Sequence, residues 1–328
     1  MKLTLEQIKS ITLGAVDVWE ENGSVCFCRF NRQQMEMYRE RRADFYKKAH
    51  STAGVKLQFR TDSKTLSMKV QIAPGSSRDY FSVDVFADGK YVGGITELPD
   101  RYLGDFSGEV NLGEGEKTVT VYLPWSMELK LQALCLEEGA SVAPVRPAKT
   151  LLIYGDSITQ GYDARNSYMR YAGKLAAFLD AQEHNRAIGG EVYYAELAKL
   201  EGDIKPDYVA VAYGTNDWSK ESQEGLREQC RGFVKTISEK YPQAQIFVMT
   251  PIWRKDFQAE RPFGDFQDVE KIIRECCQGL SNVQVVRGFD FVPKDESYYA
   301  DLRLHPNDEG FRHYAQSLCK AIAELIEN

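Results

Sequence analysis

The sequence predicts two domains, an antiparallel β-sandwich of the jelly-roll kind over residues 1–147 and an α/β domain, with a parallel sheet flanked by helices, over residues 148–328. The length of 328 residues exceeds what one hydrophobic core usually serves. Apolar and polar residues alternate with period two in the first part, whereas short apolar runs alternate with helical spacing in the second. The stretch from Pro144 to Pro147 separates the two patterns.

Alternation in the first part indicates strands with one face on a core and the other in water. Such runs occupy residues 55–59, 66–72, 80–86, 118–123 and 129–133. Asp88-Gly89 lies between two strand-like runs, which is a strong hairpin signal. The charged run at 33–48 could form a short helix. Short strands joined by turns predict the sandwich or jelly roll.

The second part alternates apolar strands with helices, which predicts parallel βαβ units and a sheet with helices on both faces. The expected strands are 149–154, 208–212, 245–249 and 283–286. The expected helices are 168–179, 221–240, 266–277 and 308–326. In such sheets ligands bind at the carboxyl ends of the strands.

The net charge, the hydropathy pattern and the cysteine count indicate which partners and which location to expect. The net charge of −7 disfavours nucleic acid and anionic membranes, which would repel the chain. The chain has no run of 18 apolar residues and no signal-peptide pattern at its start. Its seven cysteines are odd in number and irregularly spaced, which favours reduced thiols. We therefore expect a cytoplasmic protein that binds neither nucleic acid nor membrane.

Ser157 follows the first apolar strand directly, within Gly155-Asp156-Ser157, so it is expected at the carboxyl end of that strand. The alternative is an ordinary turn with a serine cap. Asn216 stands in Gly214-Thr215-Asn216-Asp217, after the second strand, where its amide could donate to an oxyanion. An Asx turn is the alternative for this segment.

His305 precedes Pro306 in the loop before the last helix. Its ordinary pKa of about 6.5 suits a general base near neutral pH. Of the four histidines, His50, His184 and His313 have no motif around them. An exposed loop histidine is the alternative reading of His305 taken alone.

Gly155-Asp156-Ser157-Ile158, Gly190, Gly214-Thr215-Asn216-Asp217 and His305-Pro306 together resemble the motif blocks of the SGNH (GDSL-like) hydrolase superfamily, over roughly residues 149–328. The resemblance implies a flavodoxin-like sheet and a serine esterase, with Ser157 as nucleophile and His305 as its base. It also implies an oxyanion hole from the N–H groups of Ser157 and Gly190 and the amide of Asn216. Gly189 stands where the family usually has serine, so a one-residue shift from Gly190 stays open.

The acid departs from the family pattern, which usually has aspartate three residues before the histidine. That position is Leu302, and Asp301 lies four residues before His305. Asp301 can orient the imidazole if the loop bulges. Otherwise a backbone carbonyl would orient it, giving a Ser–His dyad.

The order of a sandwich before an SGNH half resembles the two-domain sugar esterases of carbohydrate esterase family 2. Trp218 and Trp253 could stack on a sugar ring, and Arg254 could contact substrate, although core packing for the tryptophans and a solvated position for the arginine are alternatives. No metal or other cofactor is expected, because the chain has no paired-ligand motif and the mechanism is metal-free.

The expected function is removal of small acyl groups, acetyl above all, from a small-molecule or oligosaccharide ester. The alternatives are a lipase or thioesterase acting on acyl chains, and a carbohydrate-binding protein with an inactive site.

Overall fold

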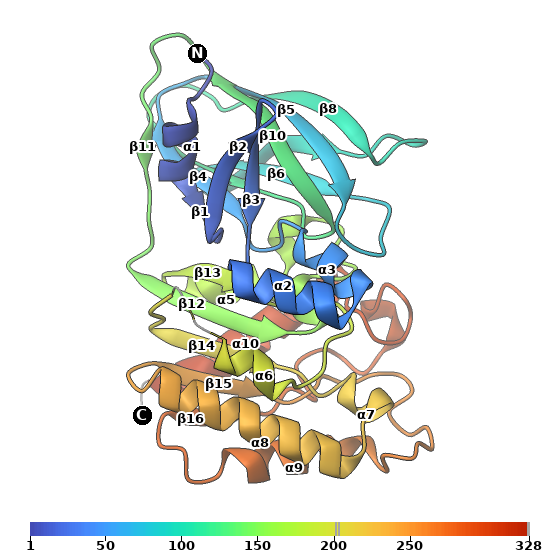
Figure 1. The fold of residues 1–328 in the computed structure, drawn as a ribbon. Coiled ribbons are helices and arrows are strands. Elements are labelled where there is room, and N and C mark those ends of the chain that lie inside the picture. The colour runs from blue at the N-terminus through green and yellow to red at the C-terminus, as the bar shows by residue number, and fades with distance from the viewer. Residues whose placement is uncertain (201, 203, 327–328) are drawn as a thin grey trace. The chain divides into compact units, whose positions relative to one another are not determined.

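A computed structural model describes residues 1–200, 202 and 204–326 (Figure 1). The chain divides into two compact units. Unit 1 comprises Met1–Ala148 with the short segments Arg165–Tyr168 and Gln182–His184, and unit 2 comprises the other residues after 148. The division falls one residue after the boundary predicted from the prolines.

Unit 1 is built on two antiparallel sheets. The first has the order β1-β4-β9-β6-β7, with β11 paired to β4, and the second has the order β2-β3-β10-β5-β8. The strands are β1 (Thr12–Leu13), β2 (Asp17–Glu21), β3 (Ser24–Cys28), β4 (Lys56–Thr61), β5 (Thr65–Pro74), β6 (Ser82–Ala87), β7 (Lys90–Thr96), β8 (Gly104–Asn111), β9 (Lys117–Tyr122), β10 (Met127–Leu136) and β11 (Ala143–Pro144). Their inward side chains form one buried core, to which both sheets contribute. The predicted sandwich is confirmed.

The predicted hairpin at Asp88-Gly89 joins β6 to β7. Both turn residues have positive φ, +48° for Asp88 and +75° for Gly89, as a type I′ turn requires. The helices of unit 1 are α1 (Leu5–Ile11), α2 (Arg32–Arg41) and α3 (Ala43–Ala49). The single helix expected over 33–48 is therefore two, because Arg42 is extended, with φ −164° and ψ 132°.

Unit 2 contains a sheet of order β13-β12-β14-β15-β16. Its strands are β12 (Lys149–Gly155), β13 (Ala181–Asn185), β14 (Tyr208–Ala212), β15 (Gln245–Met249) and β16 (Val283–Val286). The pairs β12–β14, β14–β15 and β15–β16 are parallel, as predicted. β13 was not predicted, because its residues are mostly polar.

Helices flank this sheet. They are α4 (Ser157–Gln160), α5 (Tyr171–Phe178), α6 (Ala195–Lys199), α7 (Asp217–Lys220), α8 (Gln223–Lys240), α9 (Phe266–Cys277) and α10 (Asp308–Ile326), with short 3₁₀ turns η1 (Ser167–Met169) and η2 (Glu296–Tyr298). In unit 2, α8 packs against α6 and α9, and α10 packs against α5 (Figure 1). No helix among the described residues is both long and apolar enough to cross a membrane.

Candidate active site

Ser157 is the first residue of α4, immediately beyond the carboxyl end of β12. Asp156 caps the helix, since its Oδ1 accepts the Ile158 N–H at 2.9 Å. The cap is therefore the aspartate, and the serine hydroxyl is left for another partner. Gly155 fits because a Cβ at this position would collide with the Thr159 hydroxyl. The turn places Ser157, which exposes 5% of its surface, at the edge of the sheet where ligands bind.

Ser157, His305 and Asp301 form a continuous hydrogen-bonded chain. The Oγ of Ser157 lies 2.9 Å from Nε2 of His305. The Nδ1 of His305 lies 2.8 Å from Oδ2 of Asp301. With the Nδ1 proton donated to the carboxylate, Nε2 is the basic nitrogen that faces the serine. This geometry fits a nucleophile, a base and an orienting acid.

The loop that carries Asp301 and His305 bulges at Leu302. Leu302 has a left-handed backbone with φ +55°, and its side chain is exposed. The other carboxylate oxygen of Asp301, Oδ1, accepts the N–H groups of Arg303, Leu304 and His305 at 3.0, 2.7 and 3.1 Å. The acid thereby fixes the loop and the imidazole together.

Burial of Asp301 works to raise its pKa, but hydrogen bonds from the His305 ring and from the Leu304 and His305 N–H groups outweigh it. The pKa of Asp301 is consequently lowered well below its ordinary value. Asp301 is thus a carboxylate at neutral pH, as an acceptor for Nδ1–H must be.

Asp163 is a second carboxylate at the same imidazole, and no motif in the sequence predicts it. Its Oδ2 lies 3.5 Å from Nδ1 of His305, and its side chain is 8% exposed. Asp163 has φ +72°, an uncommon conformation for a residue other than glycine. It lies six residues after Ser157, outside the motif blocks, and a single aspartate without a motif gave no signal.

The segment from Asn185 to Gly190 is fixed by hydrogen bonds to buried side chains. Asn185 is fully buried, donates to the Thr159 carbonyl at 3.0 Å and accepts the Ala187 N–H at 3.0 Å. The Gly189 N–H donates to Oε1 of Gln160 at 2.8 Å, so it already has an acceptor. In the described part of the chain, the Gly190 N–H has none. These contacts favour Gly190 over Gly189 as an oxyanion donor.

The replacement of serine at position 189 has a steric reason. A Cβ on Gly189 would lie 2.7 Å from Cε2 of Tyr162 and 2.9 Å from its hydroxyl oxygen. The Tyr162 ring in turn stands 5.7 Å from the His305 ring, at an interplanar angle of 33°. The glycine therefore makes room for the aromatic ring beside the proposed base.

Asn216 and Asp217 have different tasks in their block. Asn216 donates one amide hydrogen to the Glu191 carbonyl at 2.9 Å, which leaves the second for a substrate oxygen. Asp217 accepts the N–H groups of Tyr193 and Gly214, each at 3.0 Å. Asp217 thus ties the Asn216 segment to the loop that carries Gly190, which orients two of the three proposed oxyanion donors.

Two aspartates beside the site are fully buried. Burial raises the pKa of Asp156 to about 6 and that of Asp217 to about 7. Their mutual repulsion adds to the shift at Asp217. Both carboxylates serve as acceptors for backbone N–H groups.

Trp218 and Arg254, which were expected to contact substrate, are both buried, and their contact with substrate stays a prediction. Trp218 is 1% exposed, and its indole N–H donates to the Gly264 carbonyl at 2.9 Å. The Arg254 and Arg261 guanidinium groups lie 5.0 and 4.2 Å from the Trp218 ring centre. Arg254 is buried rather than solvated and pairs with Asp256 at 2.6 Å. Both side chains pack the interior next to the site.

Trp253, the other tryptophan expected to stack on a sugar ring, is 8% exposed. Its ring lies 5.3 Å from the Tyr299 ring, and its carbonyl accepts the Tyr299 hydroxyl at 3.0 Å. Tyr299 forms an isolated antiparallel β-bridge with Pro306, the residue that follows His305. Trp253 therefore supports that loop, and stacking of its remaining exposed edge on substrate stays a prediction.

Asp163, Asp301 and His305 could together offer three metal ligand atoms within 4.8 Å. The hydrogen-bonding pattern favours a different role. The Nδ1 of His305 is hydrogen-bonded to Asp301, and its Nε2 faces Ser157. The arrangement suits proton transfer to and from Ser157 without a metal.

Residues 153–313 match the model of the GDSL-like Lipase/Acylhydrolase family. The chain carries a GDSL-like acylhydrolase domain. The resemblance drawn from the motif blocks is confirmed, and with it the class of an ester-bond hydrolase. No curated protein sequence is a significant match to the chain.

Solved structures with the fold of the acylhydrolase domain also share the preceding sandwich. The salicylyl-acyltransferase SsfX3 from a tetracycline biosynthetic pathway is 20% identical, with a TM-score of 0.81 over 96% of this chain and 94% of that one. A Bacteroides ovatus protein described as a GDSL-like lipase is 20% identical, with a TM-score of 0.80 over 100% and 98%. A family two carbohydrate esterase from Cellvibrio japonicus is 19% identical, with a TM-score of 0.68 over 100% and 98%. The two-domain architecture is thereby confirmed.

Proposed function

We propose that the acylhydrolase domain is a serine esterase that removes small acyl groups, acetyl above all, from carbohydrate esters. The observation that carries this proposal is the hydrogen-bonded chain from Ser157 through His305 to Asp301. Its substrates would be small-molecule or oligosaccharide esters.

The proposed reaction has two acyl-transfer steps. Ser157 Oγ attacks the ester carbonyl carbon while its proton passes to Nε2 of His305. The tetrahedral intermediate then breaks the ester C–O bond, and His305 returns the proton to the departing sugar oxygen. A water molecule, deprotonated by His305, attacks the acyl-enzyme and releases the carboxylic acid and the free serine.

The developing oxyanion would be held by three donors, the N–H groups of Ser157 and Gly190 and the free amide hydrogen of Asn216. Support comes from the hydrogen bonds that fix their surroundings, at Asn185, Gln160 and Asp217. Fixed donors aimed at a developing charge stabilise the transition state without reorganising during the reaction. Asp301 would stabilise the imidazolium that forms on His305.

The two-domain architecture is shared by an acyltransferase, a lipase-like protein and a carbohydrate esterase, and sugar esters are the substrates that we propose. The family two carbohydrate esterase resembles this chain across both domains. An enzyme acting on long acyl chains would need an extended apolar channel beside Ser157. A chain-length series of p-nitrophenyl esters separates the two classes. Activity that collapses beyond acetate or propionate supports the sugar esterase, and activity that grows with chain length supports a lipase or thioesterase.

The test is acetate release from p-nitrophenyl acetate and from acetylated xylo-oligosaccharides. Wild type should cleave both. Ser157→Ala should lose at least roughly 10³-fold in kcat, while Ser219→Ala, a control at an exposed serine of α7, should not. Full activity in Ser157→Ala rejects the nucleophile. Silence of wild type on every ester favours an inactive carbohydrate-binding protein.

A further inference from the structure

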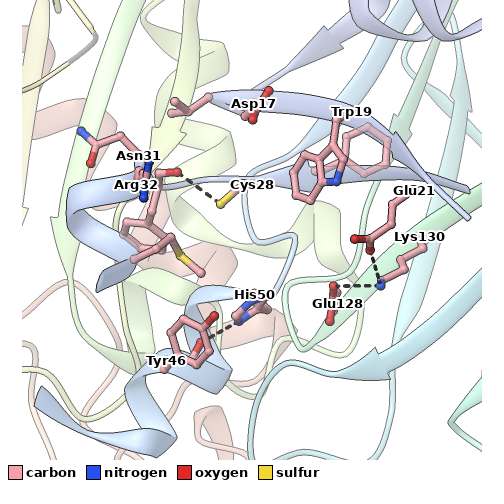
Figure 2. Close-up of a pocket in the computed structure, with 14 residues that line it drawn as sticks. Asp17, Trp19, Glu21, Cys28, Asn31, Arg32, Tyr46, His50, Glu128 and Lys130 are labelled. Carbon is pink, nitrogen blue, oxygen red and sulfur yellow. Dashed lines mark hydrogen bonds and ion pairs between the residues drawn. The ribbon is translucent and has the colours of Figure 1, made fainter. Parts of the chain in front are cut away.

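Unit 1 contains a cavity of about 890 Å³, within the range that holds small-molecule and oligosaccharide ligands. It lies along β2 and against one end each of β3 and β10, and residues of α2 and α3 wall it (Figure 2). All of its lining residues belong to unit 1. Binding here would be independent of the esterase chemistry, because no lining residue belongs to the acylhydrolase domain.

Trp19 is the aromatic side chain that distinguishes this cavity. Of the four tryptophans in the chain, Trp125, Trp218 and Trp253 are buried, and Trp19 alone is exposed, at 38%. In the described part of the chain no other aromatic ring and no cation stacks on its indole. An uncovered indole on a strand that borders a cavity offers a flat apolar face to a ligand.

Polar groups surround this apolar face. In the view of Figure 2, Tyr46 and His50 lie on the side of the cavity opposite Trp19. The Nδ1 of His50 is 2.8 Å from the Tyr46 carbonyl and must donate to it. Nε2 has no partner among the described residues and is left as an acceptor for a ligand hydroxyl.

Acidic groups add further acceptors. Lys130 lies 3.5 Å from Glu21 and 4.0 Å from Glu128, so one ammonium holds two carboxylates beside the cavity (Figure 2). A carboxylate has about four lone-pair sites, most of which these long contacts leave open. The charged side chains of the lining are Asp17, Glu21, Glu128, Arg32 and Lys130.

This combination selects one ligand class. Three acids against two bases disfavour phosphorylated and acidic ligands. An acyl chain is disfavoured as a ligand because it would remove water from the charged side chains of the cavity without offering them hydrogen bonds. A neutral sugar presents a face of C–H groups to an indole and hydroxyl groups to carboxylate and imidazole acceptors. We propose that this cavity is a binding site for a neutral oligosaccharide, with Trp19 as its stacking platform.

The experiment is isothermal titration of the full-length chain with cellohexaose, xylohexaose and mannohexaose. Trp19→Ala should weaken binding of whichever hexasaccharide associates by about tenfold or more, and Trp19→Phe should weaken it less. His50→Phe, which keeps a flat ring but removes Nε2, should also weaken it. Tyr102→Ala is the matched control, because Tyr102 is equally exposed at 38% and lies outside the cavity lining.

Turnover of p-nitrophenyl acetate should stay within about twofold of wild type in Trp19→Ala, which shows that the variant is folded. Binding lost in Trp19→Ala and kept in Tyr102→Ala supports the site. Binding that Trp19→Ala leaves unchanged overturns it and assigns the sugar to another surface. Failure of all three hexasaccharides to bind wild type overturns it as well.

Discussion

Asp301 and His305 are four residues apart in the chain, yet Oδ2 and Nδ1 meet at 2.8 Å because Leu302 between them has a left-handed backbone. The loop needs no glycine for this turn, since Asp301 Oδ1 accepts three successive N–H groups and holds the strained conformation. The departure from the usual spacing is thereby compensated within the loop.

Leu302→Gly should preserve or slightly raise stability, because glycine adopts positive φ without a Cβ penalty. Leu302→Val should destabilise the loop by about 1–2 kcal/mol, since a β-branched residue tolerates φ +55° poorly. Urea unfolding and kcat on p-nitrophenyl acetate measure both effects. Equal stability and activity in the two variants would mean that the left-handed turn is not what brings Asp301 to His305.

Asp301→Asn should lower kcat by roughly 10²- to 10⁴-fold, because an amide cannot stabilise the imidazolium and can favour the wrong tautomer. Asp163→Asn should lower it by less than about tenfold, because its oxygen is 3.5 Å from Nδ1 and Asp301 is nearer. Steady-state kinetics of both single variants and of the double variant measure how much of kcat depends on each aspartate. A larger loss in Asp163→Asn would make Asp163 the orienting acid.

Gly189→Ala should destabilise the acylhydrolase domain by about 1–3 kcal/mol, because the new methyl group would lie 2.7 Å from the Tyr162 ring. Displacement of that ring toward His305 should also lower kcat. The same substitution in a Tyr162→Leu background should have a smaller effect, which a double-mutant cycle of unfolding free energies measures. Additive effects would show that the two positions do not clash.

Asp217 should make the free energy of unfolding fall as pH rises. Burial raises its folded-state pKa to about 7, so the native state favours the protonated form more than the unfolded state does. Its contribution is fully present below the ordinary pKa of about 4 and is lost as pH rises to about 7. Asp301 has the opposite sign, and its contribution is lost only at more acid pH, below its ordinary pKa.

Asp217→Asn should therefore flatten the fall in unfolding free energy between about pH 4 and pH 7. It should also lower stability overall by about 1–3 kcal/mol, because the amide group cannot accept from both Tyr193 and Gly214. Urea titrations across this range measure both. An unchanged slope would mean that Asp217 is ionised throughout.

Strong local patterns made most of the fold predictable. The strands at 208–212, 245–249 and 283–286 and the helices at 266–277 and 308–326 have the predicted bounds. Several elements were not predicted, among them β2, β3, β8, α1 and α6. Two further features were missed because their local composition gives the opposite signal. In β13, Glu183, His184 and Asn185 are polar yet buried, and the break at Arg42 lies in an uninterrupted charged run.

Within the site, the residues of the motif blocks could be named in advance because their spacing is local. The contact of Asp301 with His305 depends on the positive φ of Leu302. A leucine in the sequence does not predict a positive φ, because residues other than glycine rarely adopt it. The approach of Asp163 and the burial of Trp218 depend on tertiary packing between segments distant in sequence. The exposed Trp19 and its cavity likewise depend on tertiary structure and correspond to no sequence motif.

The measurement that tests the central claim most directly is mass spectrometry of the chain after reaction with a fluorophosphonate. We predict one covalent adduct, located on the peptide that contains Ser157. It should be absent in Ser157→Ala and form much more slowly in His305→Ala. An adduct on a different serine, or ester turnover by a chain whose Ser157 does not react, would contradict it.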